Sequence, residues 1–357
     1  MQHIKNLKIN KLPKSEVEIT GEIDAEYFGS FWEKAVKDVS QNVKIDGFRS
    51  GNIPEAILLK TVGEAAILEE AAEQALKKVY PEILVENKVA AIDRPEISIT
   101  KIAKGNPLGF SMKVPVLPEF DLPTSYKKIA KDISTKTKTT KDEVTEKEID
   151  DLITQIRKSR APHIHDPKET KGSEKDGDKE HADLPLPEFN DEFVKSLGKF
   201  EGVEDFKTKI RANLLEEKAM KRKEDARMEV LETISKEVKI DIPQVLLEAE
   251  LDKMVSELTG RLEQYGIKFD DYLKNTKKTE VDIRKESAEI AGQRVKYNLI
   301  LKKIAKEENI APLQEEVDLE VQKILDYYKG ADPDSAKVYI LNVLTNEKTL
   351  NYLENIE

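Results

Sequence analysis

The alternation of polar and apolar positions changes its period several times along the first third of the chain. Residues 15–24 alternate strictly and predict a half-buried β-strand. Residues 25–41 change to helical spacing, and residues 57–87 are rich in Ala, Leu and Glu, which predicts a second helical stretch. Gly63 is expected to divide that stretch into a short and a long helix, because glycine weakens helix interiors. The apolar face expected for the first helix consists of Phe28, Trp32, Ala35, Val36 and Val39.

Three short apolar runs follow and predict strands. They cover residues 89–92, 96–102 and 108–116, with a turn at 104–107 between the last two. A strand, then helices, then a small antiparallel sheet indicate an α+β domain. Residues 126–140 are rich in Lys and Thr and alternate in polarity, which predicts an extended connector strand.

The second half of the chain has helical spacing almost throughout. A helix is expected over 141–161, and a long one over 203–239 has apolar ends and a polar middle, as in a helix that spans a gap between packed regions. Asp241 is expected to cap the next helix and Pro243 to start it. Further helices are predicted over residues 281–308, 313–329 and 334–355, with a break at 330–333. The fold class expected is an α+β domain followed by an elongated all-α domain with long helical arms.

Composition narrows the functional classes. The chain has 357 residues, of which 36% are charged and 6% aromatic, and its net charge is −11. This acidic balance argues against a DNA-binding protein, which needs a basic surface. The lack of cysteine excludes disulfides, thiolate metal sites and a cysteine nucleophile. No segment has the apolar core of a signal peptide or the ~20 apolar residues of a membrane span. We therefore expect a cytoplasmic protein that does not contact a membrane.

One loop carries an unusual combination of residues. Residues 47–54 read Gly-Phe-Arg-Ser-Gly-Asn-Ile-Pro. The two glycines permit positive φ, and the proline suits the start of a helix. Phe48 beside Arg49 on an exposed tip is typical of an interface anchor. The alternative is an ordinary surface turn with Phe48 folded back into the core, and the octapeptide alone favours that alternative.

The surroundings of the loop favour the interface. The strand, the helix that bears Trp32, a G-F-R-x-G-x-x-P loop and an Ala-rich helix resemble the ribosome-binding domain of trigger factor, the bacterial chaperone at the polypeptide exit tunnel. Residues 110–119 are similar to the F-x-x-x-V-x-V-x-P-E strand ending of that family. Residues 240–250 resemble a second family signature, I-D-I-P-x-x-L-L-x-x-E, and residues 293–304 are also family-like. The resemblance covers nearly all of the chain except residues 163–183.

The resemblance implies docking onto the ribosomal large subunit near the exit tunnel. In the family the loop tip is Phe-Arg-Lys. Phe48 and Arg49 match, whereas Ser50 replaces the lysine, so the tip lacks one positive charge. A lysine contact to a phosphate or carboxylate contributes ~1–2 kcal/mol, and docking is therefore expected to be weaker. The ribosome-binding residues expected from the resemblance are Gly47, Phe48, Arg49, Ser50, Gly51, Asn52 and Pro54.

The catalytic domain of the family is expected to be absent. In the family a peptidyl-prolyl isomerase of the FK506-binding type lies in the middle of the chain, whereas residues 163–183 are mostly charged and predict a disordered linker. His163, His165 and His181 would form a poor metal site on such a linker, because zinc requires three or four fixed ligands. We therefore expect no isomerase activity, no catalytic residues, no metal and no cofactor.

Four segments are expected. They are a ribosome-binding-like domain at 1–125, a connector strand and helix at 126–162, the charged linker at 163–183 and a helical substrate-cradling domain at 184–357. The resemblance implies that the helical arms hold unfolded chains through many weak contacts, for which flexible Met side chains are suited. Some of the following candidates are expected to belong to the core of the helical domain instead. The candidate client-binding residues are Met220, Met228, Met254, Tyr265, Tyr297, Tyr327 and Tyr328.

The leading interpretation is an ATP-independent chaperone that docks at the ribosome and shields nascent polypeptides, assisting their folding and export. One alternative is a ribosome-independent holdase or scaffold that has lost docking through Ser50. A second alternative is a prolyl isomerase. The expected partners are the ribosomal large subunit and nascent or unfolded polypeptides. The free chain is expected to be either a monomer or a homodimer.

Overall fold

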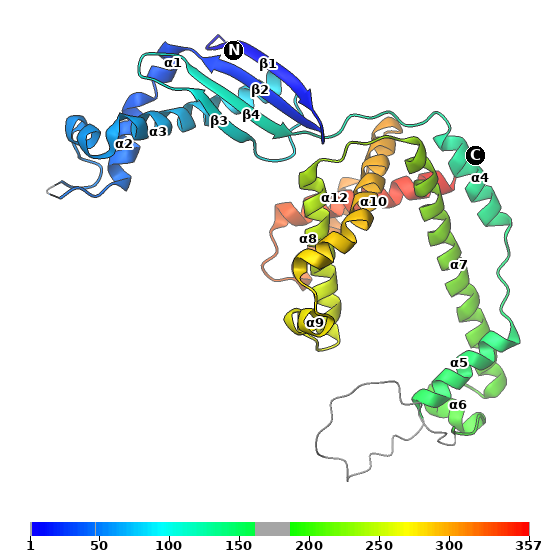
Figure 1. Cartoon of the computed structure of the whole chain (residues 1–357). Helices are drawn as coiled ribbons and strands as arrows, with labels where there is room; N and C mark the ends of the chain where they lie inside the picture. The colour runs from blue at the N-terminus through cyan, green and yellow to red at the C-terminus, as the bar shows by residue number, and fades with distance from the viewer. Residues whose placement is uncertain (1, 47, 161–185, 357) are drawn as a thin grey trace. The chain divides into compact units, whose positions relative to one another are not determined.

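The computed structural model describes residues 2–46, 48–160 and 186–356. Its contacts group the chain into two compact units, each drawn from two separate stretches. The first unit comprises residues 1–123 and 235–309, and the second comprises residues 124–234 and 310–357. Figure 1 shows the elements of each unit. The expected linker at 163–183, with its three histidines, lies outside the described residues, and the expected division into four segments stays a prediction.

A four-stranded antiparallel sheet forms the N-terminal part of the first unit. The strands are β1 (Ile4–Leu12), β2 (Glu16–Ile23), β3 (Glu96–Lys101) and β4 (Leu108–Pro115), in the order β1-β2-β4-β3. The alternating run at 15–24 is confirmed as β2, in which alternate residues are buried. The prediction missed β1, because its lysine-rich sequence makes an exposed edge strand with few buried positions. The strand expected at 89–92 is wrong, since only an isolated bridge between Ala91 and Val116 forms there.

Helix α3 (Glu55–Glu86) supplies most of the core against this sheet, with α1 (Ala25–Gly29) and α2 (Trp32–Asn42) beside it (Figure 1). The expected break at Gly63 is confirmed by its φ of +83°, which interrupts the helix. The helix expected over 25–41 is in fact two helices. The apolar face predicted for it is confirmed: Phe28 and Ala35 are buried, and the other three predicted residues pack partly buried against the same core.

The connector strand expected at 126–140 is wrong, because these residues form helix α4 (Tyr126–Thr139) in the second unit. The alternation of Lys and Thr is compatible with a strand, yet Tyr126 and Ala130 are one helical turn apart and both buried. Helix α12 (Pro333–Glu354) packs against α4. Packing of this face therefore overrides the β-propensity of the threonines.

Three helices of the second unit surround a small aromatic-rich core. They are α5 (Glu146–Ser159), α6 (Asp191–Leu197) and the N-terminal part of α7 (Val203–Glu237). Thr145 and Glu148 form a capping box at the start of α5. The guanidinium of Arg157 donates a hydrogen bond to the Pro187 carbonyl at 2.8 Å, which joins α5 to the segment that leads into α6. The long helix expected at 203–239 is confirmed as α7, whereas α6 was not expected.

The remaining helices complete the two units. In the first unit α8 (Gln244–Gln264) and α10 (Glu280–Glu307) pack together, joined by the unexpected short helix α9 (Phe269–Thr276) (Figure 1). In the second unit α11 (Gln314–Tyr327) packs on α12. The cap expected from Asp241 is wrong: Pro243 is the N-cap residue of α8, and the Asp241 carboxylate accepts a hydrogen bond from the Ser15 amide instead. An α+β region followed by a helical region confirms the expected fold class.

Candidate functional site

The loop between α2 and α3 presents an aromatic side chain to solvent. Phe48 is 39% exposed, so the alternative in which it folds back into the core is wrong. Two tight turns shape the tip, since the Phe48 amide donates to the Ile45 carbonyl at 3.1 Å and the Asn52 amide donates to the Arg49 carbonyl at 3.0 Å. Figure 1 shows this loop protruding from α2 and the start of α3. Gly47 lies outside the described residues.

The C-terminal half of the loop is attached to the body of the unit. The amide of Gly51 donates to the carbonyl of Ser40 in α2 at 2.9 Å. Gly51 has a φ of +86°, which favours glycine at this position. Ile53 is buried in the main core of the unit. Pro54, the N-cap residue of α3, accepts hydrogen bonds at its carbonyl from the first turn of that helix. The exposed tip therefore stands on an anchored base.

A tryptophan reinforces this base. The indole N–H of Trp32 donates to the Glu55 carboxylate at 2.8 Å. The ammonium of Lys104, in the turn before β4, lies 3.9 Å from the centroid of the Trp32 ring. Cation–π contacts of this kind contribute ~0.5–1 kcal/mol at exposed sites. Sequence reasoning placed Trp32 only on an apolar helix face, because the pairing with Glu55 depends on how α2 and α3 pack.

The charge of the tip comes from Arg49. Its side chain is exposed, and within the described part of the chain its guanidinium has no ion-pair partner. Ser50 and Asn52 are also exposed. The expected residues 48–52 and Pro54 are thus brought together on one short loop. The aromatic ring and the guanidinium are both available to an outside partner, with polar neutral side chains between them and the base.

The candidate client-binding residues fall into both units. Met254, Tyr265 and Tyr297 belong to the first unit, where Tyr265 is exposed and the other two are half-buried. The second unit holds the other four, all of them exposed. These four are Met220 and Met228 on α7, and Tyr327 and Tyr328 at the end of α11. The rings of Tyr327 and Tyr328 meet edge to face, with centroids 4.8 Å apart.

Helix α12 exposes apolar side chains that the sequence analysis missed. Ala336, Ile340 and Leu353 of this helix are buried, yet other large apolar residues on it face solvent. The exposed ones are Val338, Tyr339, Leu341 and Val343. The available signal was a run of apolar residues too broad for one helix face, since a helix that is apolar all round is usually covered on all sides. A helix of this kind that is half exposed offers a surface for an apolar partner.

Two further properties bear on function. Across the ranges 2–46, 48–160 and 186–356, no group of three or more His, Asp or Glu side chains is placed to hold a metal ion. Within those same ranges, no helix combines the length and the apolar character needed to cross a lipid bilayer.

Comparison with known protein families gives two matches. A model described as bacterial trigger factor protein matches residues 5–156, and a model of the trigger factor C-terminus matches residues 202–356. The relative from Moorella thermoacetica, a trigger factor, is 27% identical, with 97% of this chain and 93% of the relative covered. The trigger factor of Caldicellulosiruptor bescii is 26% identical, with 90% and 88% covered.

A solved structure shares the fold. It comes from work on promiscuous substrate recognition by the trigger factor chaperone in folding and assembly, and it superimposes with a TM-score of 0.52 at 22% identity. The superposition covers 99% of this chain and 100% of that chain. The two family matches together span both described regions of the sheet and the helices. The chain therefore belongs to the trigger factor family of chaperones.

Proposed function

We propose that this chaperone docks at the exit tunnel of the ribosomal large subunit through residues 48–54 and shields nascent polypeptides without ATP. It would then work in the cytoplasm. The observation that carries the proposal is the exposed Phe48 beside the unpaired Arg49, on a loop fixed at its base. Aromatic and Arg side chains that become buried on binding are typical anchors of interfaces.

The fixed base favours docking energetically. A loop that already holds its bound conformation loses less conformational entropy when it binds. The hydrogen bonds from Gly51 to Ser40 and from Trp32 to Glu55 restrain the loop before any partner arrives. The missing lysine at Ser50 removes one electrostatic contact, so Phe48 and Arg49 supply most of the affinity.

The exposed apolar side chains of the second unit support the holding activity. Met220, Met228, Tyr327 and the exposed face of α12 are separated by charged residues. Each buried methylene contributes about 0.8 kcal/mol. Many small contacts of this kind hold an unfolded segment, and no single contact is strong enough to trap it.

We further propose that the chain has no prolyl isomerase activity. The stretch between the end of α5 at Ser159 and the start of α6 at Asp191 is shorter than the ~40 residues below which domains seldom fold without disulfides, metals or oligomerisation. The chain contains no cysteine. Refolding of a protein limited by proline isomerisation tests this proposal. Acceleration at catalytic concentrations of the chaperone would contradict it.

Ribosome co-sedimentation tests the docking. The wild type is compared with a Phe48→Ala plus Arg49→Ala variant. A matched control, Val85→Ala plus Arg94→Ala, removes the same kinds of exposed group elsewhere in the same unit. We expect the wild type and the control to co-sediment and the loop variant to be lost from the pellet. Equal binding by the loop variant and the wild type would refute docking through this loop, and the ribosome-independent holdase would then be the better account.

A further inference from the structure

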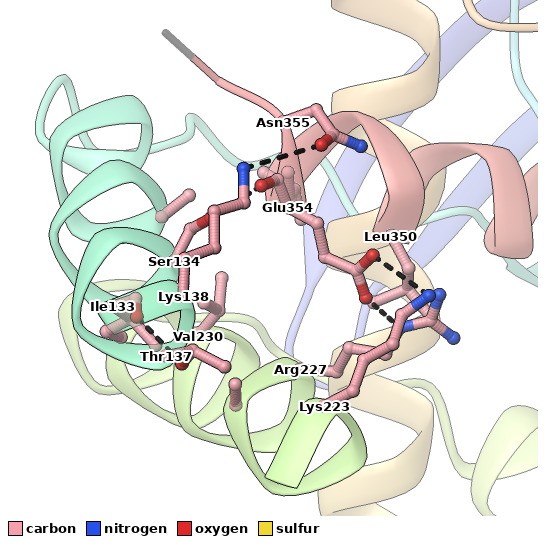
Figure 2. A pocket seen from close by; sticks show the side chains of 13 residues that line it. Ile133, Ser134, Thr137, Lys138, Lys223, Arg227, Val230, Leu350, Glu354 and Asn355 are labelled. Carbon is pink, nitrogen blue, oxygen red and sulfur yellow. Dashed lines mark hydrogen bonds and ion pairs between the residues drawn. The ribbon is translucent and has the colours of Figure 1, made fainter. Parts of the chain in front are cut away.

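A small cavity opens among α4, α7 and α12 of the second unit (Figure 2). Its volume is about 260 Å³. Most sites for drug-sized ligands and cofactors measure ~300–1,000 Å³, so the cavity suits one or two large side chains better than a cofactor. Its apolar wall is formed by Ala130, Ile133, Ala226, Val230, Leu350 and Leu353.

Small residues and polar clamps together maintain this space. Ala130 on α4 and Ala226 on α7 contribute only methyl groups to the wall. The hydroxyl of Ser134 donates to the Glu354 carbonyl at 2.5 Å, which fastens α4 to the end of α12. Arg227 holds α7 to α12 through a bidentate contact with Glu347, at 2.8 and 3.0 Å, and through its ion pair with Glu354. The helices are thus tied at the edges of the cavity while its centre stays open.

The charges at the mouth do not cancel. Figure 2 shows Lys138 reaching Asn355 on one side of the cavity, while Lys223 and Arg227 meet the Glu354 carboxylate on the other. Glu347 and Glu354 are therefore both engaged by cations of α7. Lys138 has only the neutral amide oxygen of Asn355, at 3.5 Å. Three cations face two carboxylates, which leaves a surplus positive charge at the side of Lys138.

We propose that this cavity is a client subsite that receives a large apolar side chain whose neighbour in the client sequence is acidic. The apolar wall accommodates the side chain, and the ammonium of Lys138 exchanges its weak contact with Asn355 for the client carboxylate. This inference rests on the proposed holding function and adds a sequence preference to it. Binding to the exposed face of α12 carries no such preference, because that face has no comparable cavity among its described residues.

Two fluorescent peptides test the preference. Both contain a single Phe in a Gly/Ser sequence, flanked by Asp in one peptide and by Lys in the other. We expect the wild type to bind the Asp peptide about two- to fivefold more tightly, as for an exposed ion pair. Lys138→Glu is expected to reverse the order. Lys128→Glu, an equal charge change on α4 away from the cavity, is expected to keep it. An unchanged order in Lys138→Glu would overturn the proposal.

Filling the cavity provides a second, independent test. Ala226→Leu places additional methyl groups in the wall and is expected to weaken binding of both peptides by about tenfold. Circular dichroism establishes that the variant is folded, and the reversal in Lys138→Glu remains decisive if it is not. Suppression of aggregation of an unfolded protein is measured in parallel. If the wild type suppresses aggregation but both variants bind peptides as the wild type does, the subsite is wrong and the holding function stands. If the wild type suppresses no aggregation, the holding function itself fails.

Discussion

The indole N–H of Trp32 donates a hydrogen bond to the Glu55 carboxylate at 2.8 Å, which joins the first residue of α2 to the first residue of α3. The loop that bears Phe48 lies between these two helices. The contact therefore restrains the loop from its base, although neither residue belongs to the exposed tip. A hydrogen bond of this kind to a charged group contributes ~1.5–3 kcal/mol, discounted here because Glu55 is exposed.

Removing the acceptor at Glu55 is expected to weaken ribosome binding. Glu55→Ala releases the indole and increases the conformational freedom of the loop, and we expect affinity to fall about two- to tenfold. Glu55→Gln retains a side-chain oxygen that accepts the same hydrogen bond and should bind nearly as the wild type. Trp32 is the only tryptophan, so its emission reports directly on the contact. Equal losses in both variants would show that the charge, rather than the hydrogen bond, matters.

Restoring a lysine at the tip is expected to strengthen docking. Ser50→Lys adds a cation beside Arg49 on the exposed loop, and we expect a gain of ~1–2 kcal/mol that decreases as salt is raised. The same substitution at Ser98, an exposed position on β3, adds equal charge away from the loop. Titration of labelled protein with ribosomes at two salt concentrations measures both. Similar gains from the two variants would indicate general charge attraction instead of a contact at the tip.

The exposed apolar face of α12 is expected to hold unfolded chains. Replacing Val338, Tyr339 and Leu341 by Ser should reduce suppression of aggregation several-fold, because apolar contact area with the client is lost. Stability should change little, since these side chains already face solvent. Light scattering of an aggregating protein measures the effect. Val85→Ser plus Val281→Ser, at two exposed positions outside this face, serves as the control. If the control loses as much activity, the face has no special role.

Glu148 is expected to stabilise α5 in a pH-dependent manner. The ammonium of Lys218 and the capping contacts with Thr145 lower the pKa of Glu148 from 4.5 to about 2. A carboxyl whose folded pKa is depressed contributes stability above its unfolded pKa and loses that contribution as pH falls through the folded value. Glu148→Gln should therefore increase hydrogen exchange of residues 146–159 at pH 7.

The comparison with Glu143→Gln makes that prediction specific. Glu143 lies outside the capping box, so its replacement should leave exchange in α5 unchanged. Because both variants are measured at the same pH, intrinsic exchange cancels. Their difference should shrink between pH 4.5 and 2. A difference that persists undiminished at pH 2 would assign the effect to packing instead of charge.

The sequence predicted features that depend on neighbouring residues. The break at Gly63 and the positive φ of Gly51 follow from the conformational freedom of glycine, which requires no distant partner. The exposed Phe48 was predicted from its loop together with the resemblance of its flanking elements. The strand expected at 126–140 was wrong because burial of Tyr126 and Ala130 against other helices outweighs local propensity.

Contacts between distant residues could not be predicted in this way. The Arg227 contact with Glu347 joins residues 120 positions apart, and both lie among many similar charges on the helical half. The cavity beneath them exists only because α4, α7 and α12 converge there. The exposed face of α12 was missed for a related reason, since spacing indicates that a helix has apolar residues all round but not which side remains uncovered.

Crosslinking to nascent chains on stalled ribosomes tests the central claim most directly. A photoreactive residue in the nascent chain just outside the tunnel should crosslink to the wild type and to the Val85→Ala plus Arg94→Ala control. The Phe48→Ala plus Arg49→Ala variant should lose these crosslinks while retaining its suppression of aggregation in solution. A loop variant that crosslinks as efficiently as the wild type would contradict a chaperone that reaches nascent chains by docking through this loop.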